Sequence, residues 1–177
     1  INKRLRIKLK GYDYDKKFVF SEVGYNFEPS ELGASFGIEQ LKKFKNFNKI
    51  RNRNFNLHCN FFIKLSKYFI VPKIYKGIHT NFLAYPIILK KNKKFNRKKI
   101  QIYLEKAKIQ TRPIFSGNLL RHPAFTSLIS NRNKLNSFKN SDYIMKNGLL
   151  IGCHQGLSKK DISYIHDTIL KFIKTSE

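Results

Sequence analysis

The stretch GLLIGCHQGLSKKDISYIHDTILKFIK, residues 148 to 174, predicts a buried strand that passes through a short loop into a helix. Its first part, LLIGC (149–153), is an apolar run of strand length. In its second part Ser158 and Asp161 have the spacing of a capping box, which marks the first turn of a helix. Apolar residues then recur every three or four positions and form the face that this helix should bury: Ile162, Ile165, Ile169 and Phe172.

The residues before this stretch predict further strands and helices. In chain order they are strands at 69–74 and 81–89, a helix from Asn96 to Lys106, a strand at 109–115 and a short helix from Asn140 or Ser141 to Gly148. Asn96 suits a helix N-cap, because its side-chain oxygen can accept a hydrogen bond from a free backbone N–H. Gly148 stands where a C-cap glycine would.

A longer helix is predicted ahead of these elements, extending to Leu65. Pro29 and Glu31 suit its first turn, where a missing N–H costs little and a negative charge complements the helix dipole. Gly33 and Gly37 either let another backbone or a ligand come close or pack tightly within the same chain. The apolar residues recur at intervals of three to five: Leu32, Phe36, Leu41, Phe44, Phe47 and Ile50.

Together these elements predict an α+β fold, with a short antiparallel or mixed sheet that is covered by helices and preceded by a long helix. The 177 residues are enough for one domain with a real core, or for one domain and a fragment. The chain starts at Ile1 and its first residues lack a signal-peptide pattern, so we expect the sequence to be cut from a longer one.

Other sequence features indicate the cellular location of the protein. No apolar run approaches the roughly 20 residues of a transmembrane helix. The two cysteines, Cys59 and Cys153, are far apart and outside any CxxC motif, which suits reduced thiols. We therefore expect a soluble, cytoplasmic protein that does not contact a membrane.

The net charge of +25 leaves two interpretations open. Lysines are spread along the whole chain among asparagine, isoleucine and phenylalanine, which indicates solvated helix and loop surfaces. The alternative is a basic nucleic-acid-binding module, for which the runs at 45–54 and 90–99 interleave aromatic and basic residues. No RNA-binding or zinc-finger motif accompanies these runs, so we expect nucleic acid not to be the partner.

A loop near the middle of the chain concentrates polar side chains. In IQTRPIFSGNLLRHPAF (109–125) a short apolar strand runs into a segment with two guanidiniums, an amide and an imidazole: Arg112, Asn118, Arg121 and His122. This grouping predicts that a polar ligand meets the loop. The alternative is that one of the arginines merely pairs with a carboxylate.

The sequence predicts no catalytic residue and no metal site. His58 lies beside Cys59, and Cys153 beside His154, but adjacent side chains point in different directions, so we expect structural roles. The second pair stays a candidate, because it follows a strand in a strand-to-helix loop, where sites often occur. The five histidines show no metal-ligand spacing, and no phosphate-binding glycine motif occurs.

SEVGYNFEPSELGASFGIEQLKKF, residues 21 to 44, resembles the GYN-x-x-x-x-E-x-x-A-x-x-G-x-x-Q-L signature of the DegT-type sugar aminotransferases, which depend on pyridoxal phosphate. The residues that fill the pattern in register are Gly24, Tyr25, Asn26, Glu31, Ala34, Gly37, Gln40 and Leu41. Residues 109–125 and GLLIGCHQGLS are similar to one branch, the nucleotide-sugar 3-dehydratases that act on CDP-4-dehydro-6-deoxyglucose in lipopolysaccharide biosynthesis. The resemblance covers nearly the whole chain.

This resemblance implies a type I aminotransferase fold. Residues 1–66 would be the end of the large domain and its connecting helix, and residues 67–177 the small C-terminal α+β domain. The cofactor, pyridoxal or pyridoxamine phosphate, would be held mainly by the upstream domain. The family's Schiff-base lysine, replaced by histidine in the dehydratase branch, has no counterpart here, so the chain alone should be inactive.

The resemblance also implies roles for single residues. Asn26 matches an asparagine that in relatives reaches across a dimer interface to the cofactor phosphate. An amide N–H₂ is a good phosphate donor. Arg112, Asn118, Arg121 and His122 would then form a wall of the substrate pocket, where guanidiniums grip a diphosphate or sugar oxygens.

The function that follows from the resemblance is C3 deoxygenation of a nucleotide sugar by a homodimeric dehydratase, with a reductase as a further partner. A nucleotide-sugar aminotransferase of the same family is the alternative activity, and the upstream histidine or lysine would separate the two. A remnant of a split gene is a third alternative. It would leave the apolar underside of the long helix, at Leu32, Phe36 and Phe44, as an exposed interface.

Overall fold

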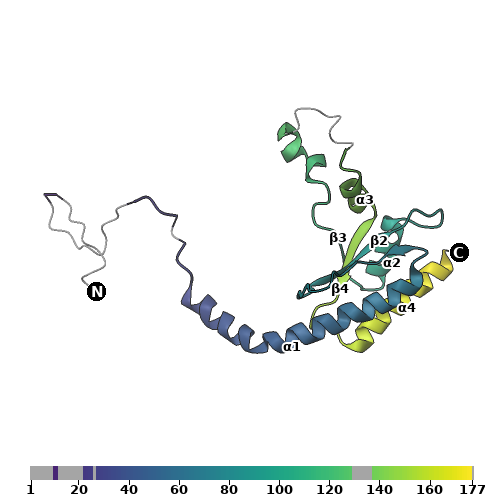
Figure 1. The fold of residues 1–177 in the computed structure, drawn as a ribbon, viewed down its shortest axis with the longest axis horizontal. Coiled ribbons are helices and arrows are strands. Elements are labelled where there is room, and N and C mark those ends of the chain that lie inside the picture. Colours follow the sequence, from purple (N-terminus) through teal and green to yellow (C-terminus); the bar gives the residue numbers. More distant parts are fainter. Residues whose placement is uncertain (1–9, 12–21, 26, 129–136, 177) are drawn as a thin grey trace. The chain divides into compact units, whose positions relative to one another are not determined.

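The computed structural model describes residues 10–11, 22–25, 27–128 and 137–176. The chain divides into two units, Ile1–Lys42 and Lys43–Glu177, and the first helix runs across the division. The second unit holds the sheet (Figure 1). The domain boundary predicted between residues 66 and 67 stays a prediction.

Helices and strands in the described part of the chain confirm the predicted α+β class with a long helix first. The α-helices are α1 (Glu31–Phe62), α2 (Arg97–Lys106), α3 (Lys139–Asn147) and α4 (Lys159–Thr175). The strands are β1 (Phe69–Ile70), β2 (Ala84–Leu89), β3 (Thr111–Pro113) and β4 (Gly148–Gly152). Three short 3₁₀ helices are η2 (Ile63–Leu65), η3 (Leu119–Arg121) and η4 (Pro123–Leu128).

The strands form one sheet in the order β1-β2-β4-β3. All three pairings are antiparallel, so the antiparallel alternative of the prediction is confirmed. β4 lies between β2 and β3, with Ala84 opposite Gly152 on one side and Arg112 opposite Leu150 on the other. The strand that comes last in the sequence therefore occupies an inner position of the sheet.

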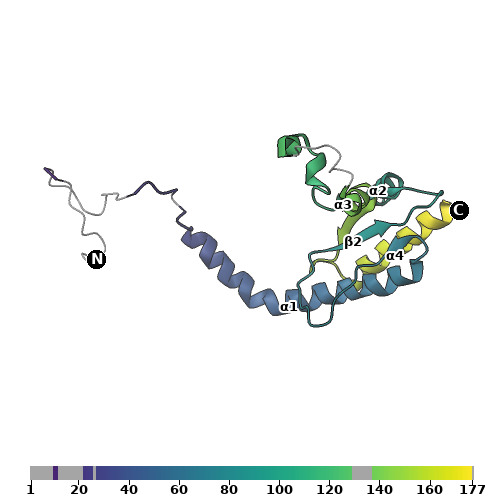
Figure 2. The ribbon, with the colours of Figure 1, turned by 45° about the horizontal axis from the view of Figure 1, so that its top comes forward.

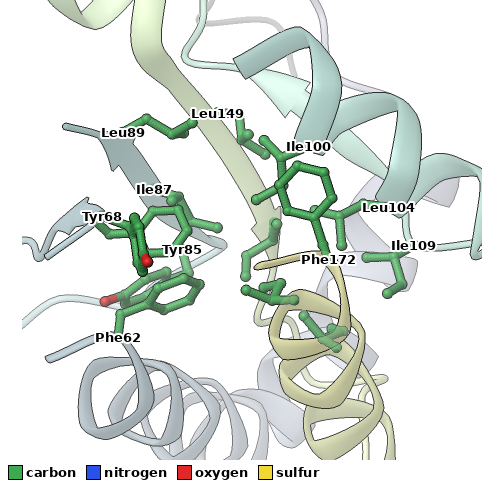
Figure 3. Packing of buried hydrophobic residues seen from close by; sticks show 14 of the residues in the cluster. Phe62, Tyr68, Tyr85, Ile87, Leu89, Ile100, Leu104, Ile109, Leu149 and Phe172 are labelled. Atoms are coloured by element: carbon green, nitrogen blue, oxygen red, sulfur yellow. The ribbon is translucent and has the colours of Figure 1, made fainter. Parts of the chain in front are cut away.

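One face of the sheet builds the core. Alternate residues of β2 are buried, namely Tyr85, Ile87 and Leu89, as strand geometry requires when one face is covered. α4 lies alongside the C-terminal half of α1 (Figure 2). Figure 3 shows Phe62, Ile100, Leu104 and Phe172 of the helices packed with the sheet residues. The buried side chains that the helices supply to this core are Phe55, Phe62, Ile100, Leu104, Ile162, Ile165, Ile169 and Phe172. Burying each of these side chains stabilises the fold by about 1.5–3 kcal/mol before entropy is counted.

The predicted caps of two helices are confirmed. In α4, Ser158 Oγ accepts a hydrogen bond from the Asp161 N–H (3.2 Å), and the Asp161 carboxylate accepts one from the Ser158 N–H (2.8 Å). This is the reciprocal capping box. In α2, the side chain of Asn96 accepts a bond of 3.0 Å from the Lys99 N–H.

Several predicted elements have different bounds in the structure. The strands predicted at 81–89 and 109–115 are Ala84–Leu89 and Thr111–Pro113. The strand predicted at 69–74 is only Phe69–Ile70. Pro72 lies just beyond it and has no N–H for a sheet bond, which explains why the strand does not continue. The short helix predicted from Asn140 or Ser141 begins earlier, at Lys139, and no side chain caps it.

Gly148 is the C-cap residue of α3, as predicted, but it does not have the left-handed conformation of a C-cap glycine. Its φ is −92°, an extended value that any residue adopts. A Cβ at this position would lie 2.6 Å from Ile114 Cδ1 and 2.7 Å from the carbonyl oxygen of Ile144. Glycine is therefore needed here for close approach.

None of the six residues of the apolar stripe predicted for α1 is fully buried: Phe47 and Ile50 are half-buried, and the other four are exposed. The buried residues of this helix are Asn54, Phe55, His58 and Phe62, all in its C-terminal half. Leu32 and Phe36 are 84% and 68% exposed. No heavy atom of the described chain lies within 4 Å of a Cβ built at Gly37, so tight packing within this part of the chain does not explain that glycine.

Candidate functional site

A cavity of about 560 Å³ lies beside β3, bounded by the residues after α2, the end of β4 and the first turns of α4. Most of its lining side chains are apolar. Its polar lining residues are Lys108, Gln110, Arg112, His154, Asp161 and Tyr164. The Asp161 carboxylate is used in the α4 capping box, and the Tyr164 hydroxyl donates to the Ala107 carbonyl (3.0 Å). The remaining polar groups are those that could meet a ligand.

Arg112 is the predicted substrate residue that lines this cavity. It is exposed, and the structure gives it no ion pair among the described residues. The charge of Arg112 acts on the carboxylate of Glu105, but only slightly. The pKa of Glu105 is lowered chiefly by a hydrogen bond from Thr111 Oγ1 (2.7 Å). The guanidinium of Arg112 therefore remains available for an anionic or hydroxyl-bearing ligand.

His154 lines the same cavity, although the sequence marked it only as a weak candidate. Its Nδ1 accepts a hydrogen bond of 3.2 Å from the Gly156 N–H. In the neutral ring the proton must then sit on Nε2. A glycine follows two residues later because a Cβ at Gly156 would lie 3.1 Å from the ring. This local turn presents His154 as a hydrogen-bond donor.

Helix α1 holds the loop that carries His154. Asn54, fully buried, donates from Nδ2 to the carbonyls of His154 (3.0 Å) and Leu157 (3.1 Å). Arg51 Nε donates to Gln155 Oε1 over 2.7 Å. Because two side chains of one helix bind three residues of the loop, the backbone beside the cavity is fixed.

Lys108 is a strained residue at the wall of the cavity. Its φ is 60°, in the left-handed region that costs a non-glycine residue about 1–2 kcal/mol. The N–H of Lys108 bonds the Glu105 carbonyl (3.0 Å) and that of Ile109 the Leu104 carbonyl (2.9 Å). These two bonds form a Schellman motif, in which glycine usually takes the place of Lys108. This residue was not predicted, because no local pattern in the sequence marks a lysine for a left-handed position.

Asn118 and Arg121 meet at a carboxylate that the sequence analysis missed. Asn118, only 4% exposed, donates from Nδ2 to Asp142 Oδ1 (2.8 Å) and accepts from the Leu120 N–H (3.2 Å). Arg121 binds the same carboxylate through Nε (3.0 Å) and Nη2 (2.5 Å). The hydrogen bonds from Arg121 and then Asn118 lower the pKa of Asp142 to about 2. Only eleven carboxylates occur in the chain, and that scarcity was the available signal.

The structure thus divides the four predicted substrate residues. Arg112 lines the cavity, whereas Asn118, Arg121 and His122 are absent from its lining. His122 Nε2 lies 2.7 Å from the carbonyl oxygen of Ser116, which can only accept, so Nε2 donates. The substrate-binding role of these residues stays a prediction.

The two cysteine–histidine neighbours have structural environments. Cys153 is fully buried and its Sγ donates to the Phe82 carbonyl (3.6 Å). Burial raises the pKa of the Cys153 thiol to about 12, so the thiolate that a nucleophile needs is scarce at neutral pH. His58 is likewise buried, and burial lowers its pKa to about 4. These environments favour the structural interpretation of Cys153 and His58, which stays a prediction.

Asn26, predicted to reach a cofactor phosphate, lies outside the described residues. Within residues that the structure describes, no group of three or more histidine, cysteine, aspartate or glutamate side chains could hold a metal ion. The described helices also include none that is long and apolar enough to span a membrane.

Comparison with known proteins identifies the family of this chain. A family model described as the DegT/DnrJ/EryC1/StrS aminotransferase family matches residues 2–170. The chain belongs to this family. It is 29% identical over 152 residues to the lipopolysaccharide biosynthesis protein RfbH of Salmonella typhimurium, a match that covers 86% of this chain and 34% of RfbH. It is 30% identical to the GDP-4-keto-6-deoxy-D-mannose 3-dehydratase of Escherichia coli O55:H7, covering 88% of this chain and 39% of that enzyme.

Solved structures of family members share the fold. The E. coli GDP-4-keto-6-deoxy-D-mannose-3-dehydratase with bound hydrated PLP superposes with a TM-score of 0.72 at 30% identity, covering 87% of this chain and 39% of that one. The aminotransferase PseC of Helicobacter pylori superposes with a TM-score of 0.73 at 21% identity, which shows the fold alone. The chain spans 34 to 39% of the length of the curated relatives it matches.

The residues that line the cavity are suited to bind a phosphate or diphosphate group, which is one part of what a PLP enzyme must bind. Lys108 and Arg112 are exposed cations on one wall, with the Gln110 amide between them in sequence. Such a donor set fits a phosphate or diphosphate, which needs charge-assisted hydrogen bonds. The described residues therefore supply the anion-binding side chains of the candidate site.

Proposed function

We propose that this chain is the C-terminal part of a pyridoxal- or pyridoxamine-phosphate-dependent nucleotide-sugar 3-dehydratase, comprising the end of the large domain and the small C-terminal domain. The observation that carries the proposal is its similarity to three relatives named as 3-dehydratases of dehydro or keto deoxysugar nucleotides, at 28 to 30% identity. CDP-4-dehydro-6-deoxyglucose is the proposed substrate, because residues 109–125 and the loop after β4 resemble the dehydratases that use it.

Arg112 is proposed to bind the diphosphate of the substrate. It is exposed, lines the cavity and has no ion pair in the described part of the chain. Arg121 is proposed to bind a sugar oxygen. It uses Nε and Nη2 on Asp142, which leaves the hydrogens of Nη1 for a ligand. Asn118 and His122 are proposed to complete this wall: Asn118 holds Asp142 in place, and His122 bonds Ser116.

Asn26 is proposed to donate to the phosphate of the cofactor held by a partner subunit. The pyridoxamine form would supply an electron sink that lets the C3 hydroxyl leave. The residues of this chain would orient the sugar against that cofactor. They include no group proposed to transfer a proton, so the chain by itself should be inactive.

We infer three further properties from the family. The full-length enzyme is a homodimer in the cytoplasm, takes part in deoxysugar and surface polysaccharide synthesis, and needs a reductase partner to complete the deoxygenation. The similarity to a lipopolysaccharide biosynthesis protein supports the pathway.

The test begins with the genomic DNA upstream of the codon for Ile1. A reading frame for the cofactor domain would be expressed together with this chain, and the product assayed with pyridoxamine phosphate and the CDP-linked sugar. We expect cofactor binding, visible in the absorbance spectrum, and loss of the C3 hydroxyl only when both parts are present. Turnover by the 177 residues alone, or no cofactor binding with both parts, would contradict the proposal.

A nucleotide-sugar aminotransferase is the second candidate. The chain is 27% identical over 157 residues to the UDP-4-amino-4,6-dideoxy-N-acetyl-beta-L-altrosamine transaminase of Campylobacter jejuni. In that case the same assay would yield an amino sugar with the C3 hydroxyl retained. Mass spectrometry of the product distinguishes the two activities.

A further inference from the structure

A second cavity, of about 630 Å³, lies between helix α1 and the segment that precedes β2. It shares no lining residue with the cavity that Arg112 lines. Its lining residues are Phe44, Asn48, Asn52, Asn56, Ile74, Ile78, His79, Thr80, Asn81 and Phe82. We call this cavity the asparagine groove.

The lining of the asparagine groove has no lysine, arginine, aspartate or glutamate, although the protein is very basic, and His79 is its one titratable side chain. Among 177 residues 36 are lysine or arginine, so a set of ten would contain two on average, yet none of the ten lining residues is Lys, Arg, Asp or Glu. Phosphates and carboxylates are bound chiefly by charge-assisted hydrogen bonds. The lining therefore favours a neutral ligand over a nucleotide or an acidic polymer.

Three amides lie along one side of the groove. Asn48, Asn52 and Asn56 are four residues apart on α1, so they share one face of the helix. Asn52 Nδ2 donates to the carbonyl oxygen (2.9 Å) and to Oδ1 (2.6 Å) of Asn48, which fixes both side chains. These bonds leave a donor, Asn48 Nδ2, near an acceptor, Asn52 Oδ1. A hydroxyl both donates and accepts, and so matches such a pair.

The opposite side of the groove combines apolar groups with a fixed backbone. The ring of Phe82 stacks on Phe55 with centroids 3.5 Å apart, and its carbonyl accepts from Cys153, so it is anchored to the core. Gly77 forms the turn before it with φ +84°, closed by a bond from the Ile78 N–H to the Tyr75 carbonyl (3.2 Å). A preformed apolar wall opposite amides is the usual composition of a small-molecule site.

We propose that the asparagine groove binds a neutral, hydroxyl-bearing ligand of one or two sugar rings. The amides bind its hydroxyls, and the side chains of Ile78 and Phe82 cover the apolar C–H face of a ring. This site is separate from the proposed diphosphate site and does not depend on the dehydratase activity, since the two cavities share no lining residue.

The experiment is an NMR titration of the ¹⁵N-labelled 177-residue chain with methyl α-D-glucopyranoside, and in parallel with α-D-glucose 1-phosphate. Asn56→Ala is the test variant, because Asn56 is exposed and lines the groove, and its side chain makes no hydrogen bond with the residues that the structure describes. Asn60→Ala is the matched control: it is an exposed asparagine on the same helix and does not line the groove. Circular dichroism confirms that both variants fold.

We expect the glucoside to shift the side-chain amide signals of Asn48, Asn52 and Asn56, with a dissociation constant in the range of about 1–10 mM. Asn56→Ala should weaken binding about tenfold, whereas Asn60→Ala should leave it unchanged. Three results would overturn the proposal: no shift of these amides, equal weakening by both variants, or stronger binding of the phosphorylated sugar at the same amides. Loss of the shifts when the cofactor domain is added would also overturn it, because the groove would then be an interdomain contact.

Discussion

His58 Nδ1 lies 3.0 Å from His166 Nε2, and the other ring nitrogen of His58 lies 3.0 Å from the carbonyl oxygen of Gly152. A carbonyl can only accept, so His58 Nε2 carries its proton and Nδ1 must accept from His166 Nε2–H. Both rings are thus neutral. Burial lowers the pKa of each to about 4, and for His166 the neighbouring charge of a protonated His58 adds to the effect.

This histidine pair predicts that the protein loses stability as pH falls. The folded-state pKa values are lowered below the unfolded value of 6.5, so the unfolded chain binds more protons. The stability is fully present above pH 6.5 and is lost as pH falls from there through about 4. His58 alone should account for a loss of about 2 kcal/mol between about pH 7 and about pH 5. Urea unfolding at a series of pH values measures it.

The matched control for this titration is His79→Gln, which removes an exposed histidine. His166→Leu should reduce the slope of unfolding free energy against pH relative to this control. A wild-type protein equally stable at both ends of the pH range would show that the pair is not neutral and buried as described.

Gly148→Ala should lower the free energy of unfolding by about 1–3 kcal/mol, the usual cost of overpacking. The new Cβ would lie 2.7 Å from the Ile144 carbonyl oxygen, which is backbone and cannot move without disturbing α3. Gly37→Ala is the control, because a Cβ there meets no atom and alanine favours a helix. Thermal and urea unfolding of both variants should show a loss for the first and none for the second.

Lys108→Gly should raise the free energy of unfolding by about 1 kcal/mol, because glycine adopts the left-handed conformation without the steric cost. Lys106→Gly, two residues earlier in the last turn of α2, should lower it by a similar amount. If Lys108→Gly were instead destabilising, the lysine side chain would have to make a stabilising contact that the structure does not show.

Asn118→Ala should lower the free energy of unfolding by about 1–2 kcal/mol, because it removes both the η3 cap and a buried donor to Asp142. Arg112→Ala should change stability by less than about 0.5 kcal/mol, as is usual for an exposed side chain. Calorimetry with CDP should instead show weaker binding for Arg112→Ala. Unchanged CDP affinity would remove Arg112 from the proposed diphosphate site.

Local signals in the sequence were sufficient to predict most of the fold. The capping box of Ser158 and Asp161 and the Asn96 cap act within one helical turn, so they mark their helices without knowledge of the rest of the chain. The start of α3 was predicted late, because it lacks a side-chain cap. The order of the strands could not be predicted, since it depends on contacts between residues far apart in the chain.

The candidate site was less predictable, for the same reason. Arg112 was found because a charged residue within a short apolar strand is visible locally. The meeting of Arg121 with Asp142, 21 residues on, and that of His58 with His166, 108 residues on, depend on tertiary packing. The lining of the asparagine groove combines a helix face with a distant loop and has no continuous sequence pattern.

The inner position of β4 determines when this domain can fold during synthesis. β2 and β3 do not pair with each other. Among the described strands, β3 has no partner and β2 has only its two-residue pairing with β1 until residues 148–152 have been made. A ribosome must therefore complete most of the chain while one edge of the apolar strand β2 remains unpaired, which is a condition that favours aggregation. Pairing over such a long sequence separation is also slow. A nascent chain that stops before Gly148 would be a client for chaperones, and one that continues past it can close its sheet.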